Sequence, residues 1–165
     1  MEAILPKGTP LIRTMPNTPA QLGEGMTVVY ADPAVPEASR KQVQAVFGAC
    51  GTCLEVDHED AIDAATAVSG SGPAYVFYLA EQMMVAAQDL GFSESAAQTL
   101  VQKTLRGAIL LWEQKGVSAA TLRRQVTSPG GTTEAAVTHF ESQAVGQHLQ
   151  EGLQKAYQRA KELAR

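Results

Sequence analysis

Hydrophobic and polar positions follow two patterns along the chain, and the change between them lies near Asp57. Before it, short runs rich in β-branched and aromatic residues, which are typical of strands, alternate with turn-rich segments. These runs occupy residues 10–15, 26–31 and 52–56. Residues 37–51 instead carry apolar side chains at helical spacing. We interpret residues 1–57 as a strand–strand–helix–strand segment from the end of a larger α/β domain, because it is too small to enclose a core of its own.

After Asp57 the pattern is helical almost throughout, and residues 58–165 are expected to form a second domain. Ser93 is an N-cap candidate, and Gly91 and Gly116 are expected to end helices. The longest helices are predicted at residues 73–91 and 93–116, and a break near Gly146 is expected before a final amphipathic helix. The apolar residues of the long helices cover more than one stripe, so these helices must be buried on most faces. Few other elements are available to cover them, which predicts a second copy of the same helices.

Composition excludes several classes of protein. Charged residues make up 18% and apolar residues 45%, against about 25% charged residues in an average soluble domain. The net charge of −4 and the pI near 5.4 argue against a nucleic-acid partner, which needs clustered Lys and Arg. The apolar runs are far shorter than the roughly 18 residues that span a bilayer. The first eight residues, "MEAILPKG", do not resemble a signal peptide, so we expect a cytoplasmic protein without a membrane partner.

The two cysteines, Cys50 and Cys53, form a C-G-T-C pattern that is compatible with a redox pair or with half of a zinc site. A redox pair is activated at a helix N-terminus, whereas this one follows a predicted helix and precedes a predicted strand. A zinc site needs two more ligands, and only His58 is close in sequence. We interpret both as ordinary thiols and expect no metal.

The segment "VSGSGPAYVFYLAE" places Gly70 and Gly72 in front of a helix, as a dinucleotide-binding turn would. Tyr75 occupies the place of the third small residue, and the preceding residues are alanine-rich rather than strand-like. A joint between two helices is the better interpretation. No other glycine spacing offers a phosphate-binding turn, so a complete nucleotide-binding fold is absent from this sequence.

The segment "RRQVTSPGGTTEAAV" combines hydroxyl groups, a proline and two glycines directly before a helix. Thr132 or Thr133 is expected to cap that helix, leaving backbone N–H groups at its positive dipole end, where an anion such as a carboxylate binds. An ordinary capped helix after a Gly-Gly turn is the alternative.

The same segment, extended to "LRRQVTSPGGTTEAAVTHFE", closely resembles the C-terminal signature of pyrroline-5-carboxylate reductases. Three further stretches resemble the same family in the right order, so that the likeness spans nearly the whole chain. These stretches are "RTMPNTPAQLGEGMTVVYA", "EDAIDAATAVSGSGPAYVF" and "LLWEQKG".

The resemblance implies an enzyme that reduces 1-pyrroline-5-carboxylate to L-proline with NADPH or NADH, the last step of proline biosynthesis. It implies a mostly α chain, in which the C-terminal remnant of a Rossmann domain precedes an interlocking all-α dimerisation domain. The partner of the apolar helices is then a second copy of the chain, and assembly beyond a homodimer stays open.

The resemblance also implies roles for individual residues. Thr133 is the expected catalytic residue, in contact with the ring nitrogen. The substrate carboxylate is expected at the loop and helix start, and two acids are expected near the substrate. These substrate-binding residues are Glu59, Glu113, Ser128, Gly130, Gly131, Thr132 and Thr133. Asn17 and Gln125 are expected near the coenzyme. Without the resemblance, we would interpret Glu59 as an acid in the first turn of a helix, where the helix dipole stabilises a negative charge. Glu113 would be interpreted as a solvated acid near a helix C-terminus.

The chain departs from the family in one respect, because the glycine-rich first half of a Rossmann domain has no counterpart in it. We therefore expect a fragment of a longer reductase, inactive alone, that supplies the substrate loop and the dimer interface. The alternative is a non-catalytic helical dimerisation module derived from the same family.

Overall fold

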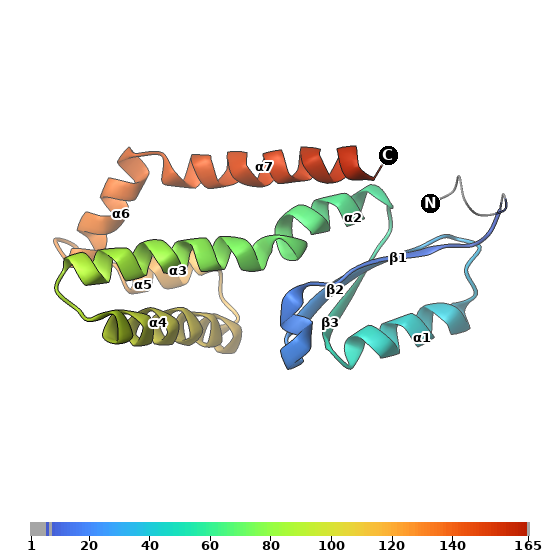
Figure 1. Ribbon diagram of the computed structural model, residues 1–165, viewed down its shortest axis with the longest axis horizontal. Helices are drawn as coiled ribbons and strands as arrows, with labels where there is room; N and C mark the ends of the chain where they lie inside the picture. The colour runs from blue at the N-terminus through green and yellow to red at the C-terminus, as the bar shows by residue number, and fades with distance from the viewer. Residues whose placement is uncertain (1–5, 7, 165) are drawn as a thin grey trace. The chain divides into compact units, whose positions relative to one another are not determined.

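The computed structural model describes Pro6 and residues 8–164 (Figure 1). The chain divides into two compact units, one formed by Met1–Ala74 with Glu151–Arg165 and the other by Tyr75–Gln150. Residues 1–5, on which the expectation of no signal peptide partly rests, lie outside the described residues.

The first unit contains a three-stranded sheet of order β1-β2-β3, formed by β1 (Ile12–Met15), β2 (Gly25–Ala31) and β3 (Gly51–Val56). β1 and β2 are antiparallel, with Ile12 opposite Ala31. β2 and β3 are parallel and are joined through helix α1 (Glu37–Gly48), because parallel neighbours need a crossover connection. The predicted strand–strand–helix–strand order is confirmed. A short 3-10 turn, η1 (Thr18–Leu22), precedes β2.

The core of this unit lies around the central strand β2. Thr27, Val28 and Val29 are consecutive and all buried, and consecutive residues of a strand point to opposite faces. Both faces of β2 are therefore covered. Figure 1 shows α1 and α2 (Asp60–Ala65) on opposite sides of the sheet; α2 contributes the buried Ile62.

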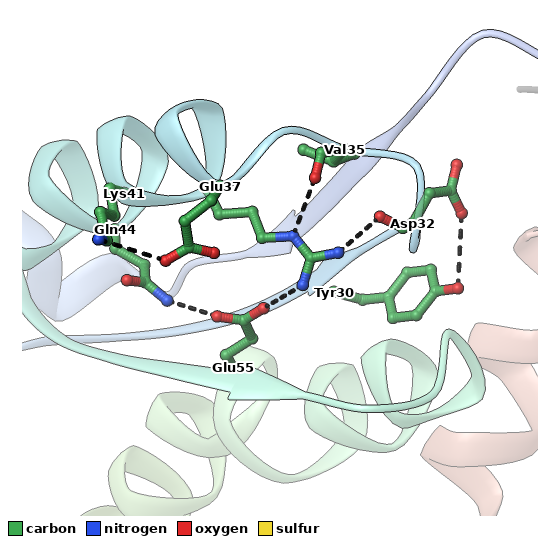
Figure 2. A network of polar contacts seen from close by, with 8 residues as sticks. Tyr30, Asp32, Val35, Glu37, Lys41, Gln44 and Glu55 are labelled. Carbon is green, nitrogen blue, oxygen red and sulfur yellow. Dashed lines mark hydrogen bonds and ion pairs between the residues drawn. The ribbon is translucent and has the colours of Figure 1, made fainter.

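Arg40 ties the loop after β2 to α1 and β3. Its guanidinium donates to the carbonyl oxygens of Asp32 at 2.9 Å and Val35 at 3.3 Å, and pairs with the Glu55 carboxylate at 3.4 Å. Figure 2 shows Gln44 of α1 directed at the other oxygen of the same carboxylate. These contacts satisfy backbone acceptors in a loop where proline interrupts regular structure.

The chain after α2 is helical. Its elements are a π turn η2 (Thr66–Gly70), α3 (Gly72–Asp89), α4 (Glu94–Lys115), α5 (Ala119–Gln125), α6 (Thr132–Ser142) and α7 (Val145–Leu163). The Ser93 hydroxyl accepts from the Ala96 N–H at 3.3 Å, as predicted for the N-cap of α4. The predicted end of that helix at Gly116 is also confirmed, with φ of 59°. The prediction of a mostly α chain that begins with a small sheet is therefore correct.

The break expected near Gly146 is confirmed, although it lies just before this residue. Helix α6 ends at Ser142, and α7 already begins at Val145, so Gly146 lies within a helix. The turn is made by Ala144, with φ of 54°. An alanine in the left-handed region is strained by its Cβ atom, which explains why a search for glycine did not find it.

Large apolar side chains of α3 and α4 are exposed. Within the described part of the second unit, the buried hydrophobic residues are Ala97 and Val101. The exposed side chains on these two helices are Val76, Phe77, Tyr78, Leu79, Val85, Leu100, Ile109, Leu110, Leu111 and Trp112. Large exposed apolar side chains gathered on two helices are typical of an interface.

Candidate active site

The loop from Ser128 to Gly131 turns the chain directly into helix α6. Gly130 has φ of 71°, and the Gly131 N–H donates to the Ser128 carbonyl oxygen at 3.0 Å. Gly131 is the N-cap residue and supplies no capping side chain. The expectation that Thr132 or Thr133 caps the helix is therefore wrong, because the tight turn starts the helix earlier and both threonines lie in its first turn.

This geometry leaves hydroxyl groups and backbone donors free at the start of an 11-residue helix. Among the described residues, the hydroxyls of Ser128, Thr132 and Thr133 have no hydrogen-bond partner, and neither do the N–H groups of Thr132 and Thr133. The Thr133 side chain is half-buried. Free N–H groups at the positive end of a helix dipole form a site for an anion.

One backbone donor of this loop is already engaged. The Gly130 N–H donates to the Glu134 carboxylate at 2.7 Å, so that a helix acid folds back onto the residue before the N-cap, as in a capping box. Glu134 was not among the predicted site residues, although its spacing from the glycines matches that motif.

Glu113 and Gln125 also lie in the second unit. Glu113 is exposed near the end of α4 and lines an open hollow of about 490 Å³ with Ile109, Trp112, Gly116 and Val117. Gln125 is exposed at the last residue of α5. No residue of the Ser128–Thr133 loop lines the hollow, so the hollow and the loop are separate features of this unit.

The remaining predicted residues, Asn17 and Glu59, lie in the first unit. Glu59 pairs with Arg13 of β1 at 2.8 Å, and the same guanidinium reaches Asp63 at 3.3 Å. The Asp63 side chain is only 12% exposed, and a buried charge of this kind needs a partner. Glu59 is thus held by an ion pair to the sheet rather than acting only as a dipole acid of α2.

The Asn17 amide joins two other segments of this unit. Its Nδ2 donates to the Ser69 carbonyl oxygen at 3.1 Å, and its Oδ1 accepts from the Met26 N–H at 2.9 Å. The sequence analysis did not identify Arg13 as part of this region. Its position four residues before Asn17, in the same extended segment, was the signal that could have indicated it.

Tyr30 of β2 lies near the carboxylates of Asp32 and Glu59. Burial raises the pKa of the Tyr30 hydroxyl above its usual value, and the Asp32 and Glu59 carboxylates raise it further. Figure 2 shows its hydroxyl directed at Asp32, with 3.5 Å between the two oxygens.

The cysteines do not form an activated pair. Cys50 is exposed in the turn between α1 and β3, whereas Cys53 is half-buried in β3. Burial raises the pKa of the Cys53 thiol, and the neighbouring Glu55 carboxylate raises it further. Within the described residues, no three His, Cys, Asp or Glu side chains gather as metal ligands would. No helix there has the length and apolar character needed to cross a membrane.

Comparison with known proteins gives one consistent family. The model for pyrroline-5-carboxylate reductase dimerisation matches residues 59–163. A pyrroline-5-carboxylate reductase of Pseudomonas aeruginosa is 43% identical over 164 residues, which are 99% of this chain and 60% of that protein. A reductase of the same description from Haemophilus influenzae is 37% identical, with the same shares.

Solved structures agree with the sequence relatives. The structure of a pyrroline-5-carboxylate reductase from Coxiella burnetii has a TM-score of 0.91 and 37% identity, covering 98% of this chain and 60% of that one. A Plasmodium falciparum pyrroline carboxylate reductase with NADP bound has a TM-score of 0.92 and 27% identity, covering 99% and 62%. The chain thus spans about 60% of the length of these relatives, in their C-terminal portion. The predicted fold class, a Rossmann remnant followed by a helical dimerisation domain, is confirmed.

Proposed function

The chain belongs to the pyrroline-5-carboxylate reductase family, and we propose that it forms the substrate-binding and dimerising part of an NAD(P)H-dependent reductase. The reaction is the reduction of 1-pyrroline-5-carboxylate to L-proline. The observation that carries the proposal is the start of α6. Among the described residues, the Ser128, Thr132 and Thr133 hydroxyls and the Thr132 and Thr133 N–H groups there have no partner and can bind a carboxylate.

The substrate carboxylate fits the start of α6 because it is an anion with two acceptor oxygens. The N–H groups of Thr132 and Thr133 and the Ser128 hydroxyl supply donors for both oxygens. Gly130 and Gly131 allow the substrate to approach the backbone, since they carry no side chain. Glu59, which is held by Arg13, and Glu113 are also proposed to bind the substrate.

Thr133 is the proposed contact to the ring nitrogen. The imine reacts in its protonated form, which is electron-poor, so the protein needs to orient the ring rather than attack it. Hydride transfer to the imine carbon moves the C=N electron pair onto the protonated nitrogen and gives the neutral ring amine, which then takes a second proton from solvent. A threonine hydroxyl both accepts and donates hydrogen bonds, and it can hold the nitrogen before and after reduction.

NADPH or NADH supplies the hydride, and which of the two is preferred stays open. Asn17 and Gln125 are proposed to lie near the coenzyme. The 165 residues contain no strand–G-x-G-x-x-G–helix turn to hold its pyrophosphate. We therefore propose that the chain contributes only to the nicotinamide end of the coenzyme site, and we expect the chain by itself to bind the coenzyme weakly.

A second copy of the chain is the proposed partner of the apolar surface on α3 and α4. Phe77 is 64% exposed, Tyr78 66% and Trp112 47%, and aromatic side chains of this kind dominate interface energetics. A homodimer would bury them, and assembly beyond the dimer is compatible with the same surface. We place the boundary between the Rossmann-like segment and the dimerisation domain at residues 57 and 58, and the protein in the cytoplasm.

Coenzyme oxidation with pyrroline-5-carboxylate tests the proposal. The 165-residue chain is assayed alone and after fusion to the N-terminal portion of the Pseudomonas aeruginosa relative. We expect turnover only from the fusion. Turnover by the chain alone would show that it carries a sufficient coenzyme site. An inactive, well-folded fusion would instead favour a non-catalytic dimerisation module.

A further inference from the structure

One side of the extended segment Arg13–Asn17 lies along α2 and the π turn. Arg13, Met15 and Asn17 alternate in sequence and therefore point to the same side. Arg13 pairs with Glu59 and Asp63, and Asn17 binds Ser69. Met15 lies against Gly70, where an added Cβ would meet the Met15 methyl carbon.

The Asn17 amide is oriented by its two backbone partners. The Met26 N–H can only donate, so it must face Oδ1, and the Ser69 carbonyl can only accept, so it must face Nδ2. One side chain thereby connects η1, β2 and the π turn.

The π turn Thr66–Gly70 uses a hydrogen-bond partner from outside its own helix. The Ser71 N–H donates to the Thr66 carbonyl at 2.8 Å, five residues back, and such turns are rare and short in helices. The Thr66 and Ser69 hydroxyls bond within the same helix, to Ile62 and Ala65. The Ser69 carbonyl instead accepts from the side chain of Asn17, the residue that precedes η1.

We infer that Asn17 is a positioning residue, which holds the π turn Thr66–Gly70 against the sheet. It thereby sets the position of the start of α3 relative to strands β1 and β2. The inference rests on the proposed function for its effect on the reaction. Asn17 acts through the backbone of the turn, because one donor and one acceptor of its amide are already bound to backbone groups.

The substitution Asn17→Asp provides a sharp test, because protonation restores what it removes. The ionised carboxylate cannot donate to the Ser69 carbonyl, and two acceptor oxygens then face each other. The protonated carboxyl donates to Ser69 and still accepts from Met26. Repulsion raises the pKa of the introduced carboxyl above about 3.9, so the defect is present at neutral pH and fades as the pH falls through that raised value.

Gln21→Glu is the matched control, since it makes the same amide-to-acid change at an exposed position of the same 3-10 turn. Amide hydrogen exchange is compared with wild type at equal pH. We expect about tenfold faster exchange confined to residues 66–71 in Asn17→Asp at pH 7, recovering near pH 4. In the fusion, kcat should fall about tenfold, whereas the KM for pyrroline-5-carboxylate should stay within twofold.

Recovery at low pH with a selective loss of kcat supports a positioning role. Asn17→Asp that matches Gln21→Glu in exchange and kinetics overturns the inference, as does a loss of protection throughout the sheet at every pH. If the wild-type fusion shows no turnover, the proposed function fails separately. Exchange at residues 66–71 then decides alone whether Asn17 holds the turn.

Discussion

The two units of the chain bury their apolar residues in different ways. The sheet unit packs Val28, Val29 and Ile62 within itself and adds polar ties through Arg13 and Arg40. The described part of the helical unit leaves most large apolar side chains of α3 and α4 exposed. With α2 added to residues 1–57, the first unit therefore has a core of its own, whereas the second needs a partner surface to complete one.

The largest expected effect is on association of the helices. Phe77→Lys places a charge on an apolar surface where Phe77 is 64% exposed in the single chain. We expect the dimer dissociation constant to rise by about a hundredfold or more, because the charge would be buried without a partner. Sedimentation equilibrium measures the change. Gln88→Lys, at an exposed polar position of the same helix, should leave association unchanged, and equal effects would contradict the proposed interface.

The core of the sheet unit gives the next effect. Val29→Ala, at a residue only 2% exposed, should lower the free energy of unfolding by about 2 kcal/mol, through lost burial and a small cavity. Val46→Ala in α1, at a residue 65% exposed, should cost less than about 0.5 kcal/mol. Urea unfolding of the two variants compares them. Similar losses would mean that this sheet has no core of its own.

Thr133 tests the proposed site within the helical unit. Thr133→Ala should weaken binding of L-proline about tenfold, because the hydroxyl contact to the ring nitrogen is lost. Thr138→Ala, at an exposed position of the same helix, should leave the affinity unchanged. Isothermal titration reports both. Unchanged affinity in Thr133→Ala would remove this residue from the site.

The strained turn between α6 and α7 should respond to a single substitution. Ala144 has φ of 54°, and Ala144→Gly should raise the free energy of unfolding by about 0.5–1 kcal/mol, because relief of strain exceeds the entropy cost of glycine. Thermal unfolding provides the measurement. Gly146→Ala, inside α7, offers a comparison in which helix propensity alone should stabilise.

The smallest effect concerns the thiols of the sheet unit. Cys50 is exposed, whereas Cys53 is half-buried with a raised thiol pKa. Alkylation at pH 8 should modify Cys50 first, because the thiolate is the reacting form. Raising the pH should speed modification of Cys53, as its thiol then ionises. Mass spectrometry of timed samples shows the order, and faster labelling of Cys53 would reverse this interpretation.

Local signals predicted much of the fold. Ser93 and Gly116 bound α4 as expected, because capping depends on neighbouring residues alone. The N-cap of α6 was predicted wrongly, because Gly131 rather than a threonine precedes the helix. The break before α7 was expected, but the turn is made by Ala144 and not by a glycine. Helix α5 was not predicted, because it is short and carries little periodicity.

The candidate site was predicted by resemblance more than by pattern. The free donors at Thr132 and Thr133 follow from the Gly-Gly turn, and that part was visible in the sequence. The Arg13 ion pairs join residues 46 and 50 positions apart, and no local rule connects such positions. Contacts of this kind depend on how α2 packs on β1.

Titration of L-proline into the 165-residue chain tests the central claim most directly, since it asks whether the loop before α6 binds a ring carboxylate. We expect saturable binding that Thr133→Ala weakens and Thr138→Ala does not. A folded, dimeric chain that shows no binding would contradict the proposed substrate site and leave a dimerisation module.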